Sequence, residues 1–387
     1  MKLNLKKFSP LNFLAPLGAG GLSIAFFAFL NYTFDHGKGL IYITQTHSLL
    51  SGSKLLFYSV MEFGMAFFAI IHIVLTIYFI KVLIQWLKTD SYKELMKNPL
   101  TSSAIFAPFV SIAMTMNVFL AAVRYFFPSV AVNLQGLMLP GFIVWVVLWL
   151  FTMRMEIRVL KHSFMTGFNI DSINFGWLMQ AFALSMVTVT GAGIAAMSQN
   201  KTIADIAMFM SLVMGSMAIF LVVVKMVSVF KSQFKRDGLP DKQFLPSILI
   251  IVPTVTVMAI AIFRFGHYLE HHQGLHLHGF FLIVVTLAYA FETWYLMFGL
   301  SLLRDYIKMN LLKEYHVSQW GLICPFVAYS VMGVFVHTFF ATNIFVFIFV
   351  VFTTAIASTL YLYLLVKQYK CAKNQSTETE EQKSICQ

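Results

Sequence analysis

Ten long apolar segments alternate with short polar connections along the chain. A helix that crosses the hydrocarbon core of a membrane needs roughly 20 mostly apolar residues. Segments of this kind cover approximately residues 10–33, 55–80, 101–123, 133–153, 173–197, 203–224, 244–264, 276–300, 316–340 and 342–366. Only a short turn near Asn343 separates the last two, but about 50 apolar residues are too many for one crossing. The pattern predicts an all-α integral membrane protein with ten transmembrane helices.

The composition favours a single membrane domain. Of the 387 residues, 59% are hydrophobic and 11% are charged, whereas about 25% are charged in soluble proteins. We therefore expect one transmembrane channel or transporter domain over residues 1–366, with the lipid bilayer as its main solvent. Residues 367–387 are polar and mixed in charge, which predicts a disordered cytoplasmic tail.

The basic residues predict the orientation of the spans. When alternate loops are assigned to opposite sides, all but five of the 27 Lys and Arg fall on the side of the two termini. The five exceptions are Lys38, Lys54, Arg124, Lys201 and Arg264. By the positive-inside rule both termini are cytoplasmic, in a multi-pass protein of the plasma (inner) membrane. The formal charge of +11 thus reports orientation and does not indicate a nucleic-acid partner.

Four odd-numbered spans carry a proline near their start. These are Pro16, Pro108, Pro253 and Pro325, each about one or two turns into the apolar run. The fifth span has no proline there but contains Gly191-Ala192-Gly193. The chain therefore reads as five helical hairpins. A proline in a spanning helix removes a backbone donor, frees a carbonyl and kinks the helix, which is tolerated where a neighbouring helix or a water-lined cavity satisfies that carbonyl. We expect such kinks at matching depths to form a narrow waist in the bundle.

The same odd spans carry small and polar residues. Candidates for the wall of a pore are Gly18, Ser111, Thr115, Thr188 and Thr256. The sixth and tenth spans are almost wholly apolar, so odd helices inside and even helices outside is the simplest arrangement. A competing interpretation is that small residues only permit close helix packing. Their occurrence with the prolines in one alternating set favours a pore.

Several short motifs resemble those of the tellurite-resistance/dicarboxylate transporter family, also known as the TehA / slow anion channel family. The motifs are Leu239-Pro240, Phe244-Leu245-Pro246 and Ile251-Val252-Pro253-Thr254-Val255-Thr256, with Asn98-Pro99 before Phe106-Ala107-Pro108. The resemblance covers most of residues 9–366. It implies ten helices in five hairpins, a quasi-fivefold inner ring of odd helices around a central pore, and a homotrimer with one pore per protomer.

The resemblance also implies a constriction in the ninth span. The family typically places a Phe immediately before a Pro there to plug the pore, but Cys324 precedes Pro325 in this chain. Phe326 points roughly 200° away from Cys324 on a regular helix, so it can replace the plug only if a kink redirects it. Cys324 could widen the pore, contact a soft or sulfur-containing substrate, or be a plain buried cysteine.

Charged residues within the spans favour anions. The odd spans hold hardly any carboxylate at mid-membrane, whereas a cation pathway is normally lined with Asp or Glu. Arg124 and Arg264, at the outer ends of the third and seventh spans, could draw anions to the mouth or act as interfacial anchors. Glu62 and Glu292 lie in even spans, where they either form structural hydrogen bonds or, with His72, act as proton sites.

A histidine-rich segment follows the seventh span. His267, His271 and His272 have the spacing of one box of a membrane di-iron enzyme. Such an enzyme needs further boxes on the cytoplasmic side, and this segment is predicted to be an outer loop. Adventitious Zn²⁺ or Cu²⁺ binding is a weak alternative to a hydrated mouth that gains positive charge as the pH falls.

We therefore expect transport of small inorganic or organic anions through a central pore in each protomer, without a cofactor and without enzymatic activity. The principal alternative is a proton-coupled carrier of C4-dicarboxylate, sulfite or tellurite-type oxyanions. A membrane di-metal enzyme is a third and weaker alternative.

Overall fold

A computed structural model of the chain is helical throughout the part that it describes. That part comprises residues 5, 8–34, 36, 39–49, 51–340 and 342–374, and it contains no strand. Ten helices within it are long and apolar enough to cross a membrane. The ten predicted spans are thereby confirmed.

Every odd-numbered span begins with a short 3₁₀ turn that continues directly into an α-helix. The five pairs are η2 (Pro10–Phe13) and α1 (Leu14–Thr33), η3 (Ser102–Phe106) and α5 (Ala107–Val118), η6 (Phe175–Leu178) and α9 (Met179–Met197), η7 (Leu245–Ile250) and α11 (Ile251–Gln273), and η8 (Val317–Leu322) and α14 (Ile323–Phe339). The third span is extended by a π-helical turn at Phe119–Val123 and by α6 (Arg124–Phe126).

The even-numbered spans are longer and start without such a turn. They are α3 (Gly52–Trp86), α8 (Leu134–Thr166), α10 (Lys201–Lys235), α12 (His278–Leu302) and α15 (Ile344–Asn374). Short helices connect the spans: α2 (Ile43–Leu49), α4 (Asp90–Lys97), α7 (Pro128–Val132), the 3₁₀ turn η5 (Ile170–Ser172) and α13 (Arg304–Met309).

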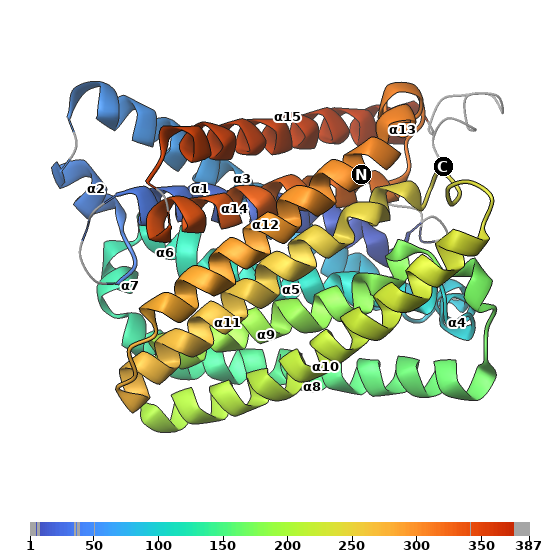
Figure 1. The fold of residues 1–387 in the computed structure, drawn as a ribbon, viewed down its shortest axis with the longest axis horizontal. Coiled ribbons are helices and arrows are strands. Elements are labelled where there is room, and N and C mark those ends of the chain that lie inside the picture. The colour runs from blue at the N-terminus through green and yellow to red at the C-terminus, as the bar shows by residue number, and fades with distance from the viewer. Residues whose placement is uncertain are drawn as a thin grey trace.

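The bundle has two distinct ends. Helices α4 and α13 lie at the right in Figure 1, together with the 3₁₀ turns that start the odd spans, and we call this the proximal end. Helices α2, α6 and α7 lie at the left, at what we call the distal end. The odd spans therefore all run from the proximal to the distal end.

The four prolines do not kink the middle of their helices, contrary to our expectation. Pro108 is the second residue of α5, while Pro16, Pro253 and Pro325 are each the third residue of their α-helix. A proline in the first turn costs little, because the amide hydrogen that it lacks has no regular partner there. The prolines thus follow the change from 3₁₀ to α geometry within two or three residues in four spans.

Odd and even spans differ in how much of their surface is buried. In the most apolar window of each span, 44% to 100% of the residues of odd spans are buried, against 22% to 33% for even spans. Large apolar side chains such as Phe63, Phe220 and Phe345 are exposed on the even spans. In a membrane these side chains face lipid or another protein.

Two boundaries extend beyond the predicted ones. Helix α11 continues to Gln273, so His267, His271 and His272 lie on a helix and not in the outer loop that we expected. Helix α15 continues to Asn374, so the segment 367–374 is helical and the expected tail begins too early. The rest of that tail, residues 375–387, lies outside the described residues.

Gly191 lets the fifth span pack tightly against its neighbours. An added Cβ would lie 2.1 Å from Trp145 Cζ2 and 2.3 Å from Ser211 Oγ. Trp145 is fully buried and donates a hydrogen bond from Nε1 to the Val187 carbonyl at 2.9 Å. Gly191 therefore serves packing between α8, α9 and α10 and does not replace a proline.

We expect Gly191→Ala to lower the thermal midpoint of the purified protein, because overpacking typically costs about 1–3 kcal/mol. Gly136→Ala is the matched control, since Gly136 is also helical and nothing lies within 4 Å of an added Cβ. Thermal unfolding in detergent measures both variants. Equal midpoints would show that the Trp145 contact is not rigid.

Candidate functional site

A cavity of about 330 Å³ opens at the proximal end between four of the five odd spans. Its wall is built from the 3₁₀ turns and the first residues of the α-helices that follow them. The lining includes Ser9 and Leu11 from the first span, Met179 and Phe182 from the fifth, Phe244, Ile250 and Pro253 from the seventh, and Val317, Gly321 and Cys324 from the ninth. The cavity therefore joins segments that lie far apart in the sequence.

Local sequence signals set the geometry of this wall. Ser9 caps η2: its Oγ accepts a hydrogen bond from the Leu11 amide, while Asn12 Oδ1 accepts one from the Ser9 amide at 2.9 Å. Pro246 occupies the start of η7, where a proline is readily accommodated. These signals begin the turns that precede the α-helices within the first and seventh spans, and residues of both turns line the cavity.

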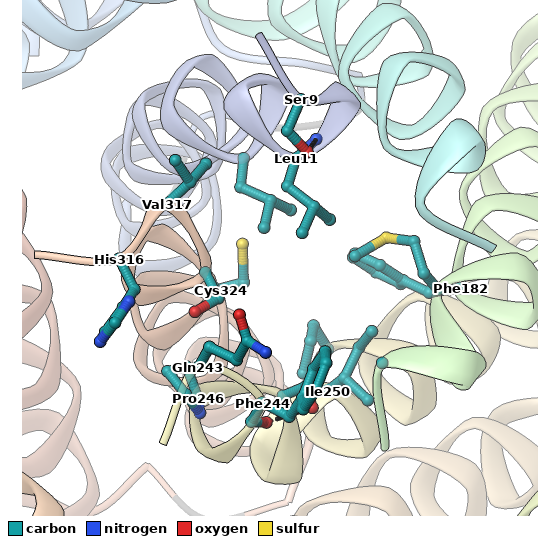
Figure 2. Close-up of a pocket in the computed structure, with 17 residues that line it drawn as sticks. Ser9, Leu11, Phe182, Gln243, Phe244, Pro246, Ile250, His316, Val317 and Cys324 are labelled. Carbon is teal, nitrogen blue, oxygen red and sulfur yellow. Dashed lines mark hydrogen bonds between the residues drawn. The ribbon is translucent and has the colours of Figure 1, made fainter. Parts of the chain in front are cut away.

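Cys324 and Phe182 reach into the cavity from different helices. Figure 2 shows the sulfur of Cys324, on α14, pointing into the open space, and the ring of Phe182, on α9, entering from another side. Both residues are nearly buried, with exposed fractions of 8% and 3%. Phe326 is not part of the lining and packs instead against the apolar core.

The polar lining of the cavity consists of hydroxyl and amide side chains and one histidine. These are Ser9, Gln243, Ser247, Ser318 and His316, and within the described part of the chain no Asp, Glu, Lys or Arg contributes to the lining. The Ser318 Oγ is buried and has no hydrogen-bond partner in that part. The cavity thus offers hydroxyl and amide donors without a fixed negative charge.

A charged pair lies in the loops at the proximal end, close in sequence to the cavity residues Gln243 and His316. Lys242 Nζ donates a hydrogen bond to Glu314 Oε1 at 3.2 Å, and this bond lowers the pKa of the Glu314 carboxyl below its ordinary value. The Glu314 carboxyl therefore stays ionised at neutral pH, beside the amine of Lys242.

Most of the predicted pore residues contact neighbouring helices. Of the eleven, only Pro253 and Cys324 line the cavity. Gly18 packs against Ile323 of α14, where an added Cβ would lie 3.3 Å from two side-chain carbons. Thr188 lies against Gly215 of α10. Pro16, Pro108 and Pro325 are buried in the first turns of their helices.

His72 holds three spans together. Its Nδ1 lies 2.7 Å from the Pro16 carbonyl oxygen of α1, and its Nε2 lies 2.8 Å from Thr115 Oγ1 of α5. Ser111, one turn before Thr115, lies 3.4 Å from the Thr76 hydroxyl of α3. These polar groups of α1 and α5 therefore face α3 and do not line the cavity.

Glu62 and Arg124 anchor the segment that contains α2 at the distal end. Glu62 accepts hydrogen bonds from the Tyr125 hydroxyl and from His47 Nε2, the latter at 3.0 Å. Arg124 is 2% exposed and donates to the carbonyls of Leu120 and Ile41 at 3.0 and 2.8 Å. Both side chains thus form hydrogen bonds with groups of the protein at the distal end.

Glu292 lies between α12 and α11. Its Oε1 accepts a hydrogen bond from Thr256 at 2.7 Å, and its Oε2 is buried without a partner in the described part of the chain. Thr256 therefore faces an outer helix. A buried carboxyl with a free oxygen is costly in its ionised form.

The three histidines of the predicted metal candidate have separate partners. His267 Nδ1 pairs with Glu270 at 3.3 Å, His271 Nδ1 lies 3.1 Å from the Ala196 carbonyl, and the ring of His272 packs against Tyr268. No group of three His, Cys, Asp or Glu among the described residues is placed to hold a metal ion.

Arg264 is inside the bundle. Its Nη1 donates to the Val189 carbonyl of α9 at 2.8 Å, and an added Cβ at Gly193 would lie only 2.6 Å from this nitrogen. From the sequence we expected Arg264 at the outer end of the seventh span, either drawing anions to the mouth or anchoring the helix at the interface. The guanidinium group, carried by α11, points toward α9.

Comparison with known proteins assigns the fold to a family. The family model described as SLAC1, voltage-dependent anion channel, matches residues 7–369. The chain belongs to the SLAC1 family. This confirms the resemblance seen in the sequence, and with the ten spans it makes the chain a multi-pass membrane protein of an anion channel and transporter family. A search of curated proteins found no significant match.

Sequence reasoning missed much of the cavity lining, including Phe182, Gln243 and Ile250. The position of the prolines gives no signal for Phe182, because the equivalent fourth residues of α1, α11 and α14, namely Leu17, Thr254 and Phe326, do not line the cavity. No local pattern identifies Gln243, whose place depends on how η7 packs beside η8.

The open path to Cys324 predicts its chemical accessibility. We expect a small neutral thiosulfonate to label Cys324 in the purified protein, as measured by peptide mass spectrometry. Ile250→Trp should slow this labelling roughly tenfold by filling the cavity, whereas Ile348→Trp on the exposed face of α15 should not. Equal rates in both variants would place the route to the thiol elsewhere.

Proposed function

We propose that the chain conducts small anions across a membrane through the centre of each protomer. The observation that carries the proposal is the cavity at the starts of the odd spans, whose lining includes no carboxylate among the described residues, in a chain that belongs to a family of anion channels. The cavity is the entrance to the pathway, and its inner end lies near Cys324 and Phe182.

Neighbour relations among the odd spans support a ring of five hairpins around this pathway. Helix α1 contacts α5 and α14, α5 also contacts α9, and α11 contacts both α9 and α14. These contacts form a closed cycle, and the even helices pack on its outside. A central axis enclosed by five helices gives a route that lipid does not enter.

Selectivity for anions follows from the lining. A carboxylate would attract cations, and the cavity has none among the described residues. The hydroxyl of Ser9 and the amide of Gln243 can replace part of the hydration shell of an anion, whereas the Ser247 hydroxyl already donates to the Phe244 carbonyl. Arg264 adds positive charge further along the pathway.

We propose that Cys324 and Phe182 together form the constriction. The family resemblance places a bulky residue at position 324, and the thiol there is small. Phe182 enters the same cavity from α9 and supplies an aromatic ring in its place.

We further propose an orientation in the membrane and an oligomeric state for the protein. The proximal end faces the cytoplasm, because the basic residues gather there, and the membrane is the plasma (inner) membrane. The exposed apolar faces of the even helices serve contacts with lipid and with two further copies in a homotrimer.

One observation favours a second candidate, a proton-coupled carrier of dicarboxylate, sulfite or tellurite-type oxyanions. Glu292 has a buried oxygen without a partner among the described residues, next to a helix of the proposed ring, as a proton-binding site would. A carrier of this kind moves protons in a fixed ratio with its substrate.

Recording from the purified protein in planar bilayers under a chloride or nitrate gradient separates the two candidates. A channel passes large currents that reverse near the equilibrium potential of the anion. Proton uptake that depends on substrate, without current beyond the coupled charge, would instead support the carrier.

Cys324→Phe should lower the anion flux at least tenfold, because the larger ring fills the space that the thiol leaves open. Phe182→Ala should raise the flux several-fold. Phe345→Ala, on an exposed face of α15, is the matched control and should leave flux unchanged. Flux into proteoliposomes measures all three, and an unaltered rate in Cys324→Phe would move the constriction elsewhere.

A further inference from the structure

We propose that Arg264 forms a binding site for a single monovalent anion, deeper in the bundle than the cavity. The proposal rests on the anion pathway proposed above and specifies where and how an anion is held within it. Arg264 lies eleven residues after Pro253 on α11, which corresponds to about 16 Å along the helix axis. The site is therefore separate from the entrance.

The guanidinium has most of its donors free. A guanidinium carries five N–H donors, and the one hydrogen bond of Arg264 within the described residues is from Nη1 to the Val189 carbonyl. No carboxylate in that part of the chain lies within 4 Å of it, so it forms no ion pair there. Arg124 differs, because its Nε and its Nη2 both bind carbonyls.

An unpaired charge inside a membrane protein is costly unless it faces an aqueous cavity or a partner. Arg264 retains part of its accessible surface although it lies between helices of the bundle. The described residues supply no negatively charged partner for Arg264, so a bound anion would be that partner.

Two features hold the guanidinium toward the interior. Phe263 packs against Phe335 and Phe339 of α14 with ring centroids 5.2 Å apart in each pair, and this contact fixes the rotation of α11. Gly193 leaves the space beside Nη1 that any side chain would fill. The side chain of Arg264 thereby extends toward α9.

Tyr32 approaches the same place from α1. Its hydroxyl is close enough to Arg264 for an electrostatic interaction and forms no hydrogen bond within the described residues. Its ring is held by Phe335, with centroids 4.5 Å apart. Tyr32 of α1 and Phe263 of α11 pack against the same two rings of α14, those of Phe335 and Phe339, so Tyr32 lies close to the segment that carries Arg264.

The charge of the site determines the class of ligand. One guanidinium offers a single positive charge, and a phenol hydroxyl beside it adds a neutral donor. This combination matches a monovalent anion such as chloride or nitrate. A dianion would leave one negative charge uncompensated in a region of low dielectric.

The test compares chloride flux through wild-type, R264Q, R264K and R304Q proteins in proteoliposomes over a range of chloride concentrations. R304Q is the control, because Arg304 is exposed at the proximal end. R264Q should raise the half-saturating chloride concentration tenfold or more, since hydrogen bonds to a charged group are strong. R264K, which keeps the charge, should fall between R264Q and the wild type.

The outcomes distinguish this site from the proposed function. Unchanged half-saturation in R264Q, in a wild type that conducts chloride, would overturn the site and leave the pathway intact. Absence of any anion flux in the wild type would overturn the pathway. In that case the binding site is tested by the increase in the thermal midpoint that chloride causes in detergent. R264Q should abolish this increase. No increase in the wild type would overturn the site.

G193A is a second variant in case R264Q does not fold. It keeps the charge but displaces the guanidinium, so it should also raise the half-saturating chloride concentration several-fold, and an unchanged value would count against the site. Competition with succinate tests the ligand class. Inhibition by succinate at lower concentration than half-saturating chloride would contradict a monovalent site.

Discussion

Polar side chains within the bundle must find partners in the protein, because the hydrocarbon around it supplies none. Unpaired polar groups in lipid cost several kcal/mol, and most buried polar groups of the spans are accordingly bonded to a neighbouring helix. His72 joins α3 to α1 and α5, and Thr256 bonds to Glu292. Bonds of this kind determine which faces of the odd helices turn toward neighbouring helices.

The most charged example lies at the proximal ends of α8, α9 and α10. Glu156 accepts a hydrogen bond from Gln180 Nε2 at 2.6 Å, and Lys225 Nζ donates to Gln180 Oε1 and to the Trp177 carbonyl, the latter at 2.9 Å. Lys225 is 2% exposed, so it lies inside the bundle and not in the loop that its contribution to the charge asymmetry implied. A buried pair linked through an amide keeps both charges out of the cavity.

The proposed pathway therefore has a simple lining. Hydrogen-bonding side chains are used to join helices, while the entrance is lined by 3₁₀ turns, apolar side chains and a few neutral donors. The isolated guanidinium of Arg264 departs from this pattern, because only one of its nitrogens has a partner among the described residues. Because the chain belongs to a family of anion channels, we interpret this guanidinium as a binding site for an anion.

The sequence by itself determined the ten spans, their alternation and the position of four prolines near the starts of odd spans. Hydrophobic length and proline position are properties of each segment alone, so they can be read without knowing the neighbours. The tertiary structure decided which face of each helix points inward. Ser111, Thr115, Thr188 and Thr256 were reasonable pore candidates, yet each turns toward a neighbouring helix, while Phe182 and Gln243 enter the cavity. The hydrophobic pattern could not reveal this, because a helix surrounded by protein is apolar on every side, and only the packing of its neighbours distinguishes one face from another.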